Sequence, residues 1–102
     1  MTAEIIASIY LNRGFRGLEE WLGVNIKLTD VDIPGCLVKT ESGWEIVINR
    51  NLPEWMILKV LFHEIYHLKN PVSIQNRGLY QYIEQKANKF AWEALKICQG
   101  KL

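Results

Sequence analysis

The segment from residue 54 to residue 69 constrains the fold more than any other part of this chain. Asn51 is a suitable helix cap, Pro53 suits a first helical turn, and Glu54 complements the helix dipole. The pair Asn70-Pro71 ends the helix, because a residue before proline disfavours helical geometry. Apolar residues cover most of the circumference: Trp55, Ile57, Leu58, Val60, Leu61, Phe62, Ile65 and Leu68. The segment therefore predicts a central helix that other elements surround.

The residues before this helix show first helical and then strand periodicity. Apolar residues at helical spacing predict a broken helix over 2–22, interrupted at Gly14 and Gly17. Alternating side chains then predict three strands, at 24–29, 36–40 and 44–49, of which the last two should form a hairpin.

The residues after the central helix predict one more helix. A polar loop is expected over residues 71–78, followed by a helix from about Leu79 to Gln99. The order of elements predicts an α+β fold, in which a small, mostly antiparallel three-stranded sheet packs against a helical layer. We expect residues 1–102 to form a single domain, since the chain length suits one compact core.

Composition and charge exclude several classes of function. The 12 Lys and Arg residues nearly balance the 11 Asp and Glu residues, so a direct nucleic-acid partner is not expected. No apolar run is long enough to span a membrane, and the N-terminus lacks the positive charge of a signal peptide. A cytoplasmic protein is therefore expected, with Cys36 and Cys98 as buried, reduced thiols.

Three ionisable residues interrupt the apolar central helix. His63 and His67 lie four positions apart, so their rings project from one helix face and can share a metal ion. Glu64 lies beside the pair and can take a proton from metal-bound water. The alternative is a structural one, in which both histidines are hydrogen-bonded core residues and Glu64 pairs with one of them. Burying such a cluster is costly unless its members are paired or metal-bound, which favours a functional role.

A catalytic zinc site usually has three protein ligands, so a third residue is needed. Glu84 is the expected ligand, because it lies at the start of the last helix. Small residues at Ala87 and Ala91 would let that helix approach the histidine-bearing one. Glu93 is a weaker candidate because it points away on an ideal helix, and Glu84 could instead be an ordinary solvated glutamate.

Two motifs together resemble the ImmA/IrrE (DUF955) metallopeptidase family. The first is His63-Glu64-Ile65-Tyr66-His67, and the second is Glu84-Gln85-Lys86-Ala87-Asn88-Lys89-Phe90-Ala91. The resemblance covers roughly residues 43–95, including a strand that ends in Ile-Asn before the first motif. It implies a zincin-like fold with His63, His67 and Glu84 as zinc ligands and Glu64 as catalytic base.

The resemblance also implies a function. We expect a zinc-dependent endopeptidase that hydrolyses a peptide bond in a cytoplasmic repressor or regulator protein of a phage or mobile element. The alternative is a catalytically weak or inactive zinc-binding domain that acts as a protein-interaction module. The sequence names neither the substrate, nor the trigger, nor the oligomeric state.

Several other residues have both a functional and a structural interpretation. Tyr66 shares a helix face with His63 and is the best of three tyrosines for stabilising an oxyanion, although a packing role is the alternative; the other two are Tyr80 and Tyr82. The strand at 44–49 could add an extended substrate if it lies at a sheet edge, and is otherwise sheet core. Asn88 could support a metal ligand, while Lys59 is expected to be solvated.

Overall fold

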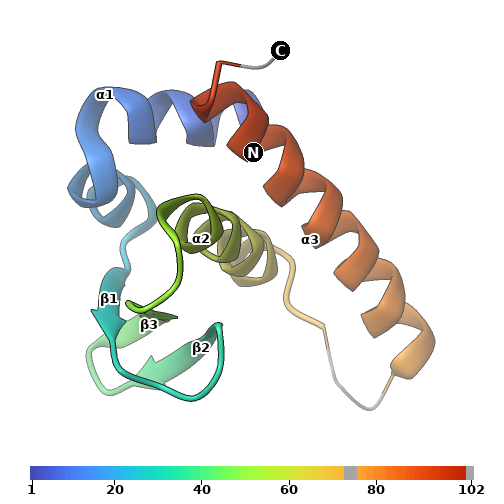
Figure 1. The fold of residues 1–102 in the computed structure, drawn as a ribbon. Helices are drawn as coiled ribbons and strands as arrows, with labels where there is room; N and C mark the ends of the chain where they lie inside the picture. Colours follow the sequence, from blue (N-terminus) through green and yellow to red (C-terminus); the bar gives the residue numbers. More distant parts are fainter. Residues whose placement is uncertain (73–75, 101–102) are drawn as a thin grey trace.

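Six elements form the fold in the computed structural model, which describes residues 1–72 and 76–100 (Figure 1). They are α1 (Ala3–Leu22), β1 (Asn25–Thr29), β2 (Gly35–Thr40), β3 (Gly43–Asn49), α2 (Glu54–Lys69) and α3 (Arg77–Cys98). The α+β class expected from the sequence is confirmed. The expected loop at 71–78 falls partly on residues 73–75, which lie outside the described residues. Within the described chain, no helix is long and apolar enough to cross a bilayer.

The first helix is broken at Gly14, one of the two glycines expected to interrupt it, whereas Gly17 continues the helix. Thr2 caps it through Oγ1, which accepts the backbone N–H of Ile5 at 3.2 Å. The break falls at Gly14, whose φ of 66° and ψ of −159° lie outside helical geometry. The helix therefore changes direction at Gly14, and its two halves follow different parts of the molecule, as Figure 1 shows.

The sheet is mixed and has the order β1-β3-β2. The predicted hairpin pairs β2 with β3 in antiparallel register, with Cys36 opposite Val47. β1 pairs with β3 in parallel, with Ile26 opposite Ile46, so the sheet is less antiparallel than the sequence analysis expected. The cause is topological: β3 returns between β1 and β2 instead of adding at an outer edge. β3 is therefore the central strand, and its alternative role as a substrate-binding edge is excluded.

Polar contacts hold the chain as it leaves the sheet for α2. Asp30 follows β1, and its carboxylate accepts two hydrogen bonds from Arg50, at 3.1 and 2.8 Å. It also accepts a hydrogen bond from Asn51 Nδ2 at 2.8 Å. The prediction that Asn51 caps the helix was wrong: Pro53 occupies the cap position, and no side chain bonds there. Asn51 instead joins the ends of the two parallel strands.

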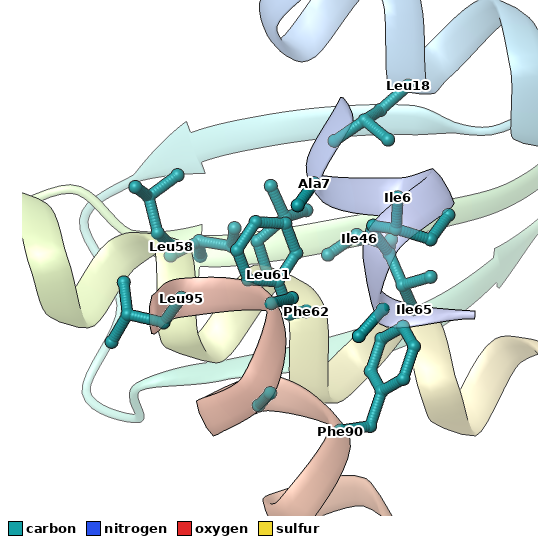
Figure 2. Packing of buried hydrophobic residues seen from close by; sticks show 14 of the residues in the cluster. Ile6, Ala7, Leu18, Ile46, Leu58, Leu61, Phe62, Ile65, Phe90 and Leu95 are labelled. Carbon is teal, nitrogen blue, oxygen red and sulfur yellow. The ribbon is translucent and has the colours of Figure 1, made fainter. Parts of the chain in front are cut away.

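Helix α2 lies between the sheet and the other two helices, as predicted (Figure 1). Figure 2 shows its apolar residues meeting those of α1, α3 and β3, with Phe62, Leu61 and Ile65 fully buried. One predicted core residue differs. Trp55, in the first turn, is 42% exposed; it stacks on Trp92 of α3, which is itself 43% exposed, so the pair lies at the surface.

Small residues let α3 pack closely against α2. Ala87, Ala91 and Ala94 are completely buried along one face of α3. Asn76 caps this helix through its Oδ1, which accepts the Leu79 N–H at 3.2 Å. The close packing brings the first half of α3 beside the C-terminal half of α2.

Candidate metal centre

Three potential metal-binding atoms converge between α2 and α3. Nε2 of His67 lies 3.2 Å from Nε2 of His63 and 2.6 Å from Oε1 of Glu84. Nε2 of His63 lies 3.2 Å from the same carboxylate oxygen. Side-chain exposures of 24%, 15% and 32% leave the three groups sheltered but reachable from solvent. The structure therefore brings together all three residues that the sequence analysis selected as ligands.

The local fold explains this convergence. His63 and His67 are one helical turn apart on α2, with ring centroids 4.8 Å apart. Glu84 lies on α3, three residues before the buried Ala87 at the helix contact. The site is therefore fixed by the same packing that holds α2 against α3.

The three atoms fit a metal ion better than they fit hydrogen bonds alone. A single proton on Nε2 of His67 can bond to His63 or to Glu84, but not to both. Ligand atoms of a tetrahedral zinc with bonds of roughly 2.0–2.1 Å lie about 3.3 Å apart. The two separations of 3.2 Å are nearly equal to this value, and the separation of 2.6 Å is about 0.7 Å shorter. A cation at the centre would satisfy all three lone pairs after a small outward movement.

The pKa of His63 favours metal binding. Burial lowers the pKa of this imidazole, and the charges of His67 and Lys59 add to that effect. The carboxylate of Glu84 acts in the opposite direction but is the smaller influence. A metal binds only the neutral imidazole, so the lowered pKa keeps His63 available as a ligand to lower pH.

Glu64 borders the same site without being one of the three converging groups. It lines a cavity of about 480 Å³ together with His67 and Glu84. Burial raises the pKa of its carboxyl group; the His67 charge opposes the rise and the Glu84 charge adds to it. A carboxylate whose pKa is raised is a stronger base than an ordinary glutamate, which suits it to accepting a proton beside the candidate metal site.

The edge strand β2 forms the other wall of this cavity, through Gly35, Cys36 and Leu37. Gly35 permits that position: an added Cβ would lie 2.5 Å from Val60 Cγ1 and 2.9 Å from the Val47 carbonyl oxygen. The absence of a side chain therefore lets β2 approach α2. Residues 35–37 of this edge strand therefore border the same cavity as the residues of the candidate centre.

The tyrosine that reaches the cavity is Tyr80. Its ring stacks on His67, with centroids 6.2 Å apart and planes 17° apart, and it lines the cavity. Tyr66 packs instead against Phe90, with centroids 5.4 Å apart, and borders a different cavity. The structure therefore does not bring Tyr66 to the cavity beside Glu64, and its catalytic role stays a prediction that this geometry does not support.

The other candidates lie outside the cluster. Glu93 borders the cavity beside Tyr66 and is not among the converging groups. Among the hydrogen bonds of the described residues, none joins Asn88 to a candidate ligand. The ammonium of Lys59 lies 4.5 Å from the centre of the Trp92 ring. Both cysteines are free thiols, as expected, but they are only partly buried and not core residues.

Sequence reasoning missed the contribution of β2 to the cavity and ranked Tyr80 below Tyr66. The strand alternation gave no pairing order, so it could not distinguish the central strand from the edge. Tyr80 had a usable signal, since it lies four residues before Glu84 and so on the same face of α3.

No family model, curated protein or solved structure compared with this chain matches it. The similarity to the ImmA/IrrE family consequently rests on the motif residues alone. The geometry supports a candidate metal site formed by His63, His67 and Glu84.

Proposed function

We propose that this protein is a zinc-dependent endopeptidase that cleaves a peptide bond in a protein substrate, such as a repressor or regulator of a phage or mobile element. The convergence of two imidazole nitrogens and one carboxylate oxygen carries the proposal. Two nitrogens and one oxygen form a donor set that zinc accepts in catalytic sites, which keep a fourth position open. Zinc held there would act as a Lewis acid on the scissile carbonyl and promote ionisation of water.

Glu64 is the proposed general base. It takes a proton from the water whose oxygen attacks the carbonyl carbon. It then delivers that proton to the amine nitrogen as the carbon–nitrogen bond breaks. Its place in the cavity beside His67, outside the ligand set, supports this role.

The substrate is proposed to bind along β2. This strand is an edge of the sheet and pairs only with β3, so its outer backbone groups can hydrogen-bond to an extended peptide. The cavity next to it contains Glu64, and an added strand would pass that carboxylate. In this proposal β2, and not the strand at 44–49, adds an extended substrate to the sheet.

Tyr80 is the proposed donor to the oxyanion that forms on the carbonyl oxygen. A hydroxyl group aimed at the developing charge stabilises it far more than the same bond would in water. The stack against His67 supports this role, because it holds the tyrosine ring at the cavity.

The decisive experiment incubates the zinc-loaded protein with a candidate repressor encoded beside its gene. We expect cleavage by the wild type and none by Glu64→Gln, with equal zinc content in both. Glu93→Gln is the matched control, because it removes a carboxylate outside the cluster. Zinc binding without cleavage of any neighbouring regulator would instead support the alternative, a zinc-bearing protein-interaction module. Cleavage that persists in Glu64→Gln would exclude the proposed base.

A further inference from the structure

A second cavity lies away from the metal centre, between the first half of α1, the first turn of α2 and the end of α3. Its volume is about 420 Å³, within the range of ligand pockets. Its lining includes Tyr10, Leu11, Glu54, Trp55, Leu58 and Gln99. Glu54 precedes His63 by nine helical residues, so the two sites are about 13 Å apart along the axis of α2.

The chemistry of this pocket suits a cation attached to an apolar chain. Tyr10 and Trp55 contribute aromatic rings and Leu58 an apolar side chain, while Glu54 is the charged residue of the lining. Aromatic faces and a carboxylate both attract an ammonium or guanidinium group. Within the described chain, none of the ion pairs involves Glu54.

The two helix ends at this pocket carry partial charges of opposite sign. The start of α2 presents partial positive charge, and the end of α3 at Gln99 presents partial negative charge of similar size. The full charge of Glu54 is therefore the main electrostatic feature. Glu54 is close enough to Tyr10 to affect it. Burial raises the pKa of the Tyr10 hydroxyl group most, and the negative charge of Glu54 raises it further.

Apolar surface continues beyond the pocket. Leu11 is 55% exposed and Trp55 is 42% exposed. Trp55 is held in place by stacking on Trp92, with ring centroids 6.4 Å apart. Lys59 already places its ammonium 4.5 Å from the centre of the Trp92 ring, so this aromatic pair accommodates one cation of the protein itself. A rim of this kind contacts more than one side chain, which favours a polypeptide over a small amine.

We propose that this pocket binds a lysine or arginine side chain of a partner polypeptide, whose neighbouring apolar residues pack on Leu11 and Trp55. The site does not depend on the proposed peptidase activity, because it shares no lining residue with the cavity at the metal centre. It would hold a protein partner on the far side of α2 from the edge strand β2.

Titration of the full chain with acetyl-Leu-Lys-Leu-amide, followed by amide NMR shifts, tests the proposal. We expect saturable shifts at Leu11, Trp55 and Gln99, and binding about tenfold tighter than that of the peptide with norleucine in place of lysine. Glu54→Gln should abolish this preference for lysine, whereas Glu93→Gln should retain it. Leu11→Ser, at an exposed position, should weaken binding of both peptides without affecting the fold.

Three results with the peptides would overturn the proposal, and a fourth comes from a small amine. They are equal binding of the lysine and norleucine peptides, an unchanged preference in Glu54→Gln, and shifts confined to other surfaces. Butylammonium that binds as tightly as the lysine peptide would exclude a polypeptide occupant. Zinc content and cleavage are measured separately, so failure here leaves the proposed function unaffected.

Discussion

Oε1 of Glu84 lies 2.6 Å from Nε2 of His67, although 17 positions separate the two residues in the chain. This contact joins α3 to α2 at the point where His63 also converges. The candidate ligand set is therefore a product of helix packing and not of one local motif. Any change that moves α3 away from α2 should weaken the site together with the fold.

Removal of one converging group should abolish tight metal binding. We expect the wild type to bind about one zinc ion, and His63→Ala or Glu84→Gln to bind it at least about 100-fold more weakly. Loss of a direct ligand costs more than the 10- to 100-fold typical of a supporting residue. Competition with a chromogenic chelator measures the change.

The control for this experiment is Glu93→Gln, which alters the same helix outside the cluster. Zinc affinity equal to that of the wild type is expected for it. If His63→Ala also kept wild-type affinity, the three atoms would not form the binding site, and their convergence would be a hydrogen-bonded core feature.

Much of the fold could be predicted because its signals are local. The central helix, the break near Gly14 and the hairpin all follow from periodicity, glycines and turn residues. The histidine pair was predictable for the same reason, since four-residue spacing sets one helix face. The parallel pairing of β1 with β3 was not, because strand order is set by long-range packing that alternation does not encode.

The candidate site also combines features that local sequence signals predict with features that long-range packing decides. Glu84 could be predicted because small residues follow it on one face of its helix. The choice between Tyr66 and Tyr80 could not, because each shares a helix face with a candidate ligand and only the rotation of α3 against α2 decides between them. That rotation places Tyr80 on His67 and turns Tyr66 toward Phe90.

Glu64→Gln should separate chemistry from metal binding. Glutamine keeps the shape of the side chain but cannot accept a proton in the attack step. We therefore expect a fall in kcat of at least about 100-fold, typical of lost general-base catalysis. Zinc content should stay at the wild-type value, since Glu64 is not among the converging groups. A parallel loss of zinc would show that Glu64 holds the metal instead.

Acid should destabilise the metal-free protein partly through His63. Its pKa is lowered in the folded state, so the unfolded chain binds a proton first as pH falls below about 6.5. The contribution to stability is thus present above that pH and is lost as pH falls toward the lowered pKa. After zinc removal by a chelator, the urea midpoint should be lower at pH 5.5 than at pH 7.5.

The same comparison in His63→Gln isolates this effect. The raised pKa of Glu64 acts in the opposite direction, because its stabilising proton is lost as pH rises through the folded pKa. Subtracting the variant's midpoint shift from that of the wild type removes this contribution. A shift as large in His63→Gln as in the wild type would contradict the assignment to His63.

Tyr80→Phe and Tyr66→Phe together distinguish the two tyrosines. Phenylalanine at position 80 preserves the stack on His67 but removes the hydroxyl group. We expect kcat to fall about 100-fold with little change in KM, as for loss of one oxyanion donor. If Tyr66→Phe produced that loss instead, the catalytic role expected from the sequence would belong to Tyr66, despite its packing on Phe90.

Gly35→Ala should disturb the fold and the cavity together. The added methyl group would meet Val60 and the Val47 carbonyl, which are parts of α2 and of the central strand. Overpacking of this kind costs about 1–3 kcal/mol of unfolding free energy.

Gly78→Ala is the matched control, because nothing lies within 4 Å of its added Cβ. That change in α3 should leave stability unchanged or raise it by up to about 1 kcal/mol. Equal unfolding free energies for the two variants would show that β2 can move away from α2 at no cost. The cavity wall would then be adaptable and not fixed by Gly35.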